Sequence, residues 1–369
     1  MNILILNWRD IKHPQAGGAE VYFHEIAKEW IKKGNNVTWI SGGWKNCVKN
    51  ENVDGIKIKR IGNSITLYLL APFAYFSLTS KPDAIVDVEN GIPFFSPIYS
   101  RKKILLHIHH VHKEVWSKQA EAGGLKEKFL APIGYFLEMV MMPWIYKNKR
   151  ITTLSKSSKK AIENYISKKV VGIISPGITQ PKQNNFKKSI KPSVLFFNRI
   201  KKYKGIDIFL RAIAGINKSN LIKDIELNIA GTGDYLEEAK TLAKELKIEK
   251  KVNFLGHVTE KEKQVLLKKS WVLINPSFVE GWGIVNIEAN SFGTPVIGSN
   301  VNGIKDSVIN KKTGLLFEYG NEKELSEKII YLIKNPSVRK KMSEQAKQFS
   351  KKFTWKNAAE TFLKILKNQ

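Results

Sequence analysis

NPSFVEGWGIVNIEANSFGTPVIG, residues 275–298, says the most about this chain. An apolar run, 271–274, comes directly before it, and another, 295–297, lies near its end. Short apolar runs bounded by turn residues are typical of buried strands, and the segment between these two predicts a helix that begins near Gly283 or Ile284. This order of strand, helix and strand indicates one unit of a doubly wound α/β domain.

Two carboxylates in this stretch, Glu280 and Glu288, have seven residues between them. Eight residues of continuous helix would turn the two side chains about 80° apart. We expect Glu280 in the loop and Glu288 inside the helix, because that placement lets both face one ligand. The free amides at the start of the same helix suit a phosphate group.

Strand and helix patterns alternate along the whole chain. The first half predicts a helix over 19–33, ended by Gly34, and strands at 2–6, 37–40, 56–61, 84–88, 104–108, 151–154 and 170–174. The second half predicts strands at 194–197, 226–230, 252–255, 271–274, 295–297 and 314–317. Capping boxes are expected at Thr259 with Glu262 and, in a looser form, at Asn321 with Glu324.

This alternation predicts two doubly wound, Rossmann-like domains that face a cleft. At 369 residues the chain is longer than a single core usually is. We place the first domain at 1–178, the second at 179–352, beginning with a polar linker over 179–192, and a closing helix at 353–369. Ligands of such sheets bind outside the carboxyl ends of the strands, which is where the polar motifs of both halves fall.

Two glycine-rich turns connect a strand to a helix. Gly17 and Gly18 lie in AGGAE after the first strand, and Gly231 and Gly233 lie in GTGD after a later one. Glycine lets a ligand approach the backbone closely, and helix amides favour an anion. A tight turn without a ligand explains either motif equally well, since the dinucleotide fingerprint GxGxxG is absent.

A basic loop, FNRIKKYKG at 197–205, joins a strand to the next helix. Arg199 follows the strand and Lys204 precedes the helix. A guanidinium and an ammonium on the two sides of one loop can both reach a diphosphate. The alternative is a basic surface loop that only faces water.

Four histidines, His107, His109, His110 and His112, lie at the end of the strand at 104–108. Residues two apart on a strand share a face, so His107 and His109 are expected to point together. Glu114 is the one acid close in sequence, and we therefore assign no metal ligands. One of the histidines is expected to position a substrate or take part in catalysis.

The composition limits the partners. Lys+Arg number 61 against 33 Asp+Glu, a net charge of +28, which fits an anionic membrane, a phosphorylated substrate or nucleic acid, or simply a lysine-rich surface. The single cysteine excludes a disulfide framework and fits a reducing compartment. Without a recognisable nucleic-acid module, we expect no nucleic-acid partner.

Two apolar segments, 67–78 and 129–146, are each expected to be a core helix or a helix in a membrane interface. Neither is an unbroken run of about 18 apolar residues, so no spanning helix is expected. The N-terminus lacks the basic flank and the length of a signal peptide. We expect a cytoplasmic protein, peripheral on the membrane face if those segments dock there.

Taken together, these motifs resemble the retaining glycosyltransferases of family 4, which have the GT-B fold. The resemblance covers nearly the whole chain in the right order, and its specific part is the Glu280 and Glu288 pair with its flanking residues. It is carried by the motifs above and by the turn at 302–304. It implies that the closing helix crosses back to the first domain. Trp282 stands where phenylalanine is more usual in the family, and Asn302 replaces a common glycine.

The resemblance also implies a role for each matched residue. Arg199 and Lys204 would hold the donor diphosphate, Glu280 would contact the sugar and Glu288 the ribose. The donor would further contact Gly17, Gly18, Gly231, Gly233, Val258 at the base, and the amides of Gly283, Ile284 and Val285. His109, or else His110, would lie near the sugar and acceptor.

The activity so implied is transfer of a hexose-type sugar, with retention, from a UDP- or GDP-linked donor to a hydroxyl of a glycan or lipid-linked acceptor. No cofactor or metal is required, because the two cations would stabilise the leaving diphosphate. The alternatives are a sugar-nucleotide epimerase of the same architecture and a non-enzymatic nucleic-acid-binding protein.

Overall fold

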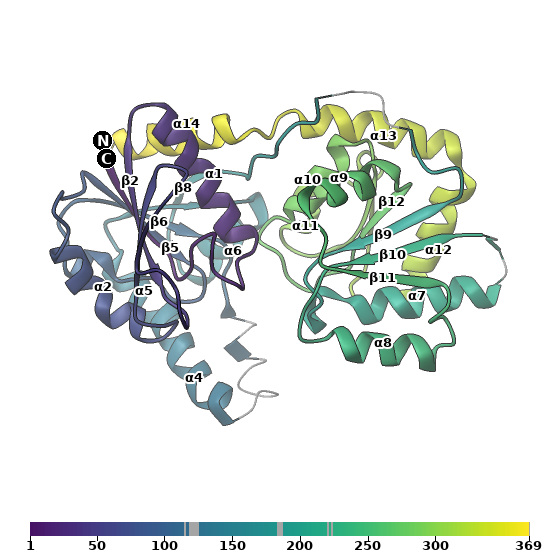
Figure 1. Ribbon diagram of the computed structural model, residues 1–369, viewed down its shortest axis with the longest axis horizontal. Helices are drawn as coiled ribbons and strands as arrows, with labels where there is room; N and C mark the ends of the chain where they lie inside the picture. Colours follow the sequence, from purple (N-terminus) through teal and green to yellow (C-terminus); the bar gives the residue numbers. More distant parts are fainter. Residues whose placement is uncertain (114–115, 118–124, 183–186, 220, 223, 369) are drawn as a thin grey trace. The chain divides into compact units, whose positions relative to one another are not determined.

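The computed structural model describes residues 1–113, 116–117, 125–182, 187–219, 221–222 and 224–368, and Figure 1 shows its course. Contacts divide the chain into two compact units. The first unit is Met1–Gly177 with Trp355–Gln369, and the second is Ile178–Thr354. Each unit is an α/β domain with its own sheet and core.

The first unit is built on an eight-stranded sheet in the order β3-β4-β2-β1-β5-β6-β7-β8. Its neighbouring strands pair in parallel, apart from β3 and β4, which are antiparallel. The strands are β1 Asn2–Leu6, β2 Asn36–Gly42, β3 Asn50–Val53, β4 Ile56–Ile61, β5 Ala84–Glu89, β6 Lys103–Ile108, β7 Arg150–Thr153 and β8 Val170–Ile173. The helices are α1 Gly18–Lys32, α2 Thr66–Phe76, α4 Leu125–Phe136, α5 Met142–Ile145, α6 Lys156–Tyr165 and α14 Trp355–Lys367. A 3-10 turn, Ser96–Ile98, and a π-helical turn, Leu137–Met141, complete the unit.

The second unit has a six-stranded parallel sheet in the order β11-β10-β9-β12-β13-β14. The strands are β9 Ser193–Phe197, β10 Glu226–Ala230, β11 Val252–Gly256, β12 Val272–Asn275, β13 Val296–Ser299 and β14 Gly314–Phe317. The helices are α7 Ile206–Ser219, α8 Leu236–Glu245, α9 Glu260–Lys269, α10 Ile284–Ser291, α11 Ile304–Ser307, α12 Glu322–Lys334 and α13 Pro336–Ser350. The helix expected near Gly283 is α10, and the capping box at Thr259 is confirmed.

The chain reverses its winding direction beside the first strand of each sheet. In the first unit β1 lies between β2 and β5, and in the second unit β9 lies between β10 and β12. Such a switch point leaves a crevice outside the carboxyl ends of the two central strands, where ligands of doubly wound sheets bind. The loops after β9 and β12 therefore meet at the ligand edge of the second sheet.

The C-terminal helix α14 returns to the first unit, as expected, and lies beside α1 in Figure 1. Its apolar face is buried through Phe362, Leu363 and Leu366. The ring of Phe362 packs edge-on against Trp30 of α1 at 5.6 Å, and the Trp30 indole N–H donates to the carbonyl of Ala359 over 3.0 Å. This burial fixes the helix to the first sheet's outer layer.

The apolar segments 67–78 and 129–146 are partly core and partly surface. Leu67 and Ala71 of α2 are fully buried, while Leu69 and Phe73 on the opposite side are each 73% exposed. Phe129 of α4 is 77% exposed. Within the described residues, no helix is long and apolar enough to cross a membrane.

Candidate functional site

The loops after β9 and β12 bring together a cation and an acid that lie far apart in the sequence. Lys204, at the end of a 3-10 turn before α7, is 5% exposed, and its ammonium forms an ion pair with the Glu280 carboxylate. The two strands that deliver these loops are parallel neighbours, with Ile274 opposite Phe196. The predicted diphosphate cation and the predicted sugar acid are therefore direct partners at the switch point.

Close backbone packing fixes the Lys204 loop. Gly205 has φ +71°, and a Cβ placed on it would lie 2.1 Å from the carbonyl oxygen of Pro276. The amide of Phe278 donates to the carbonyl of Tyr203 over 2.8 Å. Only glycine fits this approach without strain, so the segment that carries Glu280 is fixed against the segment that carries Lys204.

A network of hydrogen bonds between buried polar side chains supports Glu280. The Ser277 hydroxyl lies 3.4 Å from Glu280 Oε1 and donates to Asn275 Oδ1 over 2.8 Å. The Asn275 amide donates to Asn286 Oδ1 over 2.9 Å, and the Asn286 amide donates to the Ser307 hydroxyl over 2.9 Å. Buried side chains that are satisfied in this way keep one geometry, which positions the carboxylate.

The start of α10 lies in the same loop as Glu280. Gly283 is the N-cap with φ +78°, and the helix begins at Ile284. The amides of Ile284 and Val285 have no carbonyl partner within the helix, so they are available to an anion, whereas the Asn286 amide donates to the Gly283 carbonyl over 2.9 Å. A partial positive charge at this helix end favours a phosphate further.

Glu288 lies inside α10, as predicted, but it has a partner that the sequence analysis missed. Lys263 of α9 forms an ion pair with Glu288 over 2.7 Å and with Glu260 over 2.9 Å. Burial alone would lower the pKa of Lys263, but the two carboxylates more than offset it, and the pKa is raised. Lys263 therefore stays charged and holds the Glu288 carboxylate in place.

Two further predicted residues, Arg199 and Val258, lie in the loops that follow β9 and β11. Arg199 follows β9 and is exposed, and its guanidinium makes no ion pair with a residue that the structure describes. It is therefore available to a ligand. Val258, between β11 and the N-cap of α9, is half-buried against an apolar cluster that includes Leu273 and Ala289.

Gly231 and Gly233 are required by the protein's own packing. A Cβ on Gly231 would lie 1.9 Å from the carbonyl oxygen of Asn198, and a Cβ on Gly233 would lie 2.1 Å from that of Ile200. The Cβ side of both glycines is thus filled by the loop that carries Arg199. These glycines set the course of the Arg199 loop whether or not they also touch a ligand.

Gly17 and Gly18 begin helix α1 in the first unit. Gly17 is the N-cap, and its amide donates to Glu20 Oε2 over 2.6 Å, while Glu20 Oε1 accepts from the Trp8 indole over 3.1 Å. Glu20 is buried. The conspicuous acid of the AGGAE motif therefore caps the helix, and the amide of Gly17 is already used.

The strand-end histidines occupy two environments. His107 and His109 point together as predicted, with ring centroids 5.1 Å apart, and both pack against Tyr22 and Phe23. Burial lowers the pKa of His109 to about 3, so its imidazole is neutral. His110 is half-buried, and its ring lies 4.1 Å from that of His112.

His112 has acidic neighbours that the sequence analysis did not foresee. His112 Nδ1 lies 3.5 Å from Glu89 Oε1 and 3.9 Å from Glu138 Oε1. Burial raises the pKa of Glu89 to about 8 and that of Glu138 to about 9, and it lowers the pKa of His112 to about 4. Neither acid is close to His112 in the sequence, because Glu89 ends β5 and Glu138 lies in the π-helical turn.

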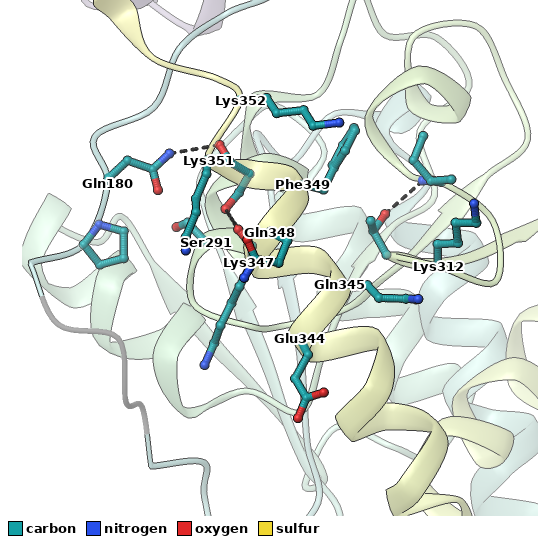
Figure 2. Close-up of a pocket in the computed structure, with 14 residues that line it drawn as sticks. Gln180, Ser291, Lys312, Glu344, Gln345, Lys347, Gln348, Phe349, Lys351 and Lys352 are labelled. Carbon is teal, nitrogen blue, oxygen red and sulfur yellow. Dashed lines mark hydrogen bonds between the residues drawn. The ribbon is translucent and has the colours of Figure 1, made fainter.

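A cavity of about 900 Å³ lies elsewhere in the second unit, along α13 (Figure 2). Its polar lining is mostly basic and amide side chains, and the Gln180 amide donates to the Ser350 carbonyl over 2.9 Å. The charged lining residues are Lys312, Glu344, Lys347, Lys351 and Lys352. None of the residues assigned above to donor binding lines this cavity.

Comparison with known proteins shows the family of the chain. A family model described as Glycosyl transferases group 1 matches residues 178–349, and one described as Glycosyltransferase Family 4 matches residues 16–180. An uncharacterised glycosyltransferase of Haemophilus influenzae is 27% identical over 369 residues, covering 95% of this chain and 96% of its own. The chain belongs to the family 4, group 1 glycosyltransferases.

Two further matches bear on the fold and on related activities. A Campylobacter jejuni protein is 32% identical over 244 residues, 65% of each chain, and is named GalNAc-alpha-(1->4)-GalNAc-alpha-(1->3)-diNAcBac-PP-undecaprenol alpha-1,4-N-acetyl-D-galactosaminyltransferase. Anabaena HepE, solved in complex with UDP-glucose, has a TM-score of 0.75 and 18% identity over the full length of both chains. The fold is that of GT-B glycosyltransferases.

Proposed function

We propose that this glycosyltransferase moves a hexose-type sugar, with retention of its anomeric configuration, from a nucleotide diphosphate sugar to an acceptor hydroxyl. The observation that supports this most is the ion pair of Lys204 with Glu280 beside the exposed Arg199 and the first turn of α10. Two cations and free helix amides suit a diphosphate, and a carboxylate suits sugar hydroxyls.

The chemistry follows from the charges that develop during transfer. As the bond between the anomeric carbon and the diphosphate oxygen breaks, negative charge grows on the leaving diphosphate. Arg199, Lys204 and the α10 amides stabilise that charge. The acceptor oxygen bonds to the anomeric carbon on the same face, and its proton passes to the departing diphosphate oxygen. No metal is assigned to this step.

The remaining site residues bind the donor or the acceptor. Glu280 contacts the sugar, and Val258 lines the base pocket. Glu288 accepts hydrogen bonds from the ribose hydroxyls, and its ion pair with Lys263 keeps its carboxylate in position. On the first unit, the start of α1 at Gly18 approaches the donor, and His109, or else His110, lies near the acceptor. Uridine is the base we test first, because a structural relative has been solved with UDP-glucose.

We further propose a membrane-bound acceptor, such as a lipid-linked glycan, and a peripheral contact with an anionic membrane. Exposed apolar side chains on α2 and α4 support this, together with the net charge of +28. The C. jejuni relative is named for a substrate carried on undecaprenol diphosphate. Basic residues near an anionic surface contribute about 1 kcal/mol each.

The first experiment is a thermal-shift screen of the full chain against UDP- and GDP-linked sugars. A binding donor raises the midpoint according to RT ln(1 + [L]/Kd). The true donor should lose its shift in Glu288→Gln and keep it in Glu163→Gln, a substitution of a half-buried residue in α6. If no nucleotide sugar shifts the wild-type midpoint, the proposal is wrong.

The second experiment separates transfer from epimerisation. The donor that binds is incubated alone and then with lipid-linked acceptors, and the products are followed by NMR. Release of nucleotide only in the presence of acceptor, with the anomeric configuration kept in the product, is expected. An epimerised donor without acceptor would support the epimerase alternative.

A further inference from the structure

Three side chains in the first unit converge without a basic partner. The ligand atoms of Glu89, His112 and Glu138 all lie within 4.8 Å of one another. Glu89 and Glu138 are fully buried, and His112 is 9% exposed. Within the described residues, no lysine or arginine forms an ion pair with either carboxylate.

Two polar atoms of these side chains lack a hydrogen-bond partner among the described residues. Glu89 Oε1 accepts from the Gly91 amide over 2.5 Å, but no residue that the structure describes hydrogen-bonds to Glu89 Oε2. His112 Nδ1 is also buried and has no hydrogen-bond partner in the described part of the chain. Burying polar atoms in this state costs about 1–3 kcal/mol each, so the geometry calls for a group that both atoms can bind.

The surrounding backbone aims these atoms at one point. Glu138 lies in a π-helical turn, a local widening that is frequent at functional sites. Its two oxygens accept from the His112 amide over 2.8 Å and from the Trp116 indole over 2.7 Å. The Trp116 ring also lies 6.0 Å from that of His112, and it packs closely on Gly134, where a Cβ would lie 2.8 Å from it. These contacts orient the carboxylate and leave lone pairs for another ligand.

We propose that Glu89, His112 and Glu138 bind one divalent transition-metal ion, with Zn²⁺ or Mn²⁺ as the chemical class. One imidazole nitrogen with two carboxylates suits these ions better than Mg²⁺ or Ca²⁺, which prefer all-oxygen sites. Ligands about 2.1 Å from a tetrahedral ion lie about 3.4 Å apart. The distances of 3.5 and 3.9 Å from His112 Nδ1 are close to that spacing.

The ion would connect three elements of the first unit. Glu89 ends β5, His112 follows β6, and Glu138 lies between α4 and α5. Binding would therefore fix the helical segment with the exposed apolar side chains to the edge of the sheet. The three ligands are not among the residues assigned to donor binding, although the His112 ring lies 4.1 Å from that of His110, and the test does not depend on the proposed function.

The test uses the full chain, stripped with EDTA, desalted, and carrying Cys47→Ser to remove the single thiol. Metal content is measured after equilibration with Zn²⁺ or Mn²⁺, and unfolding midpoints are recorded with each ion and with Mg²⁺. We expect one tightly bound ion per chain and, at about a hundredfold excess over Kd, a rise in the midpoint of about 5–10 °C. Mg²⁺ should give a much smaller rise.

Matched variants identify the ligands. Glu138→Gln and Glu89→Gln keep the shape of the side chain and should weaken binding more than about tenfold. Glu163→Gln, at a half-buried position of α6, should bind as the wild type does. With Co²⁺ as a probe, the wild type and Glu163→Gln should show the visible absorption bands of an ion with few ligands. Glu138→Gln and Glu89→Gln should not show them.

Three results would overturn the proposal. The first is an EDTA-treated wild type whose midpoint and metal content do not change with either ion. The second is a Glu138→Gln variant that binds Zn²⁺ and Co²⁺ like the wild type, which would mean that the ion binds elsewhere. The third is a wild type that binds no ion, together with a Glu138→Gln variant that is more stable than the wild type without metal. That result would mean that the two carboxyl groups are protonated and bind no metal.

Discussion

Gly303 packs directly on the backbone of Glu280. A Cβ on Gly303 would lie 2.1 Å from the carbonyl oxygen of Glu280, and Gly303 has φ +82°. Gly303 is the N-cap of α11, so the turn before this helix supports the loop that carries the proposed sugar ligand. The position of the carboxylate therefore depends on a residue without a side chain.

The first prediction concerns this contact. Gly303→Ala should destabilise the second unit by about 2–4 kcal/mol, because the methyl group adds a steric clash to a positive φ. It should also weaken donor binding, because the clash displaces the Glu280 loop. Urea unfolding and donor-induced thermal shifts measure the two effects.

Gly320→Ala is the matched control for that substitution. Gly320 has φ +85°, and a Cβ there would meet nothing within 4 Å. Gly320→Ala should lower the stability of the second unit by about 1 kcal/mol, because of the backbone conformation alone, and should leave donor binding unchanged. Equal effects of the two substitutions would show that the contact with Glu280 has no role.

The second prediction separates the structural and chemical roles of Lys204. Lys204→Met leaves the Glu280 carboxylate without its cation and should cost about 1–3 kcal/mol of stability. Adding Glu280→Gln should restore most of that stability, since no unpaired charge remains. Activity should stay about 10²–10³-fold low in both variants, because the leaving diphosphate lacks its cation. Recovery of activity in the double variant would mean that Lys204 serves only to pair with Glu280.

Much of the fold could be predicted from short apolar runs with clear boundaries. The strands expected at 2–6, 56–61, 226–230 and 314–317 coincide with β1, β4, β10 and β14. Strand β3 was missed because its residues, NENV, are polar and lie at the edge of the sheet, where only pairing with β4 defines the strand. An edge strand of this kind has no burial pattern to detect.

The sequence was enough to predict which residues form the site, but not which of them form ion pairs with each other. Motif position indicated Arg199, Lys204, Glu280 and Glu288, yet the ion pair of Lys204 with Glu280 depends on the contact of Gly205 with Pro276. The pairs of Lys263 with Glu288 and of His112 with the two buried acids join separate elements of the fold. Such pairings are set by sheet order and have no fixed spacing in the sequence.

The third prediction concerns Lys263 as a positioning residue. Lys263→Met should raise the donor KM about tenfold with little change in kcat, because Glu288 loses the cation that orients it while the diphosphate contacts remain. Steady-state kinetics over a range of donor concentrations measure the split. Lys240→Met, which removes an exposed pair with Glu237 on α8, should change neither constant. A fall in kcat with an unchanged KM would contradict the positioning role.

The fourth prediction is a pH dependence in the first unit. Asp10 forms a buried ion pair with Arg60. Burial alone would raise the pKa of Asp10, but hydrogen bonds from Arg60 and Ser41 hold it below the ordinary value of 3.8. Because the folded-state pKa is depressed, the stabilisation is fully present above the unfolded-state value, near pH 4. It is lost as pH falls through the folded-state pKa.

Hydrogen exchange of β1, β2 and β4 amides from pH 6 down to pH 2 tests this. Asp10→Asn should lower the protection of these strands by about 3 kcal/mol at pH 6 and should flatten their acid dependence. Asp234→Asn, an exposed partner of Lys201, should leave both unchanged. An Asp10→Asn chain with the acid dependence of the wild type would rule out the pair as its source.

The last prediction concerns the exposed apolar side chains of α2. Phe73→Ser with Leu69→Ser should reduce binding to anionic phosphatidylglycerol vesicles at least tenfold, because each buried side chain of this size contributes about 1.5–3 kcal/mol. Tyr331→Ser, on an exposed apolar position of the second unit, serves as control and should bind as the wild type does. Cosedimentation at low and high salt separates the two contributions, since charge attraction weakens with ionic strength and apolar insertion does not. If the wild-type chain stays in the supernatant at low salt, the membrane contact is excluded. If the α2 variant and the Tyr331→Ser control lose vesicle binding equally, α2 is not the contact surface.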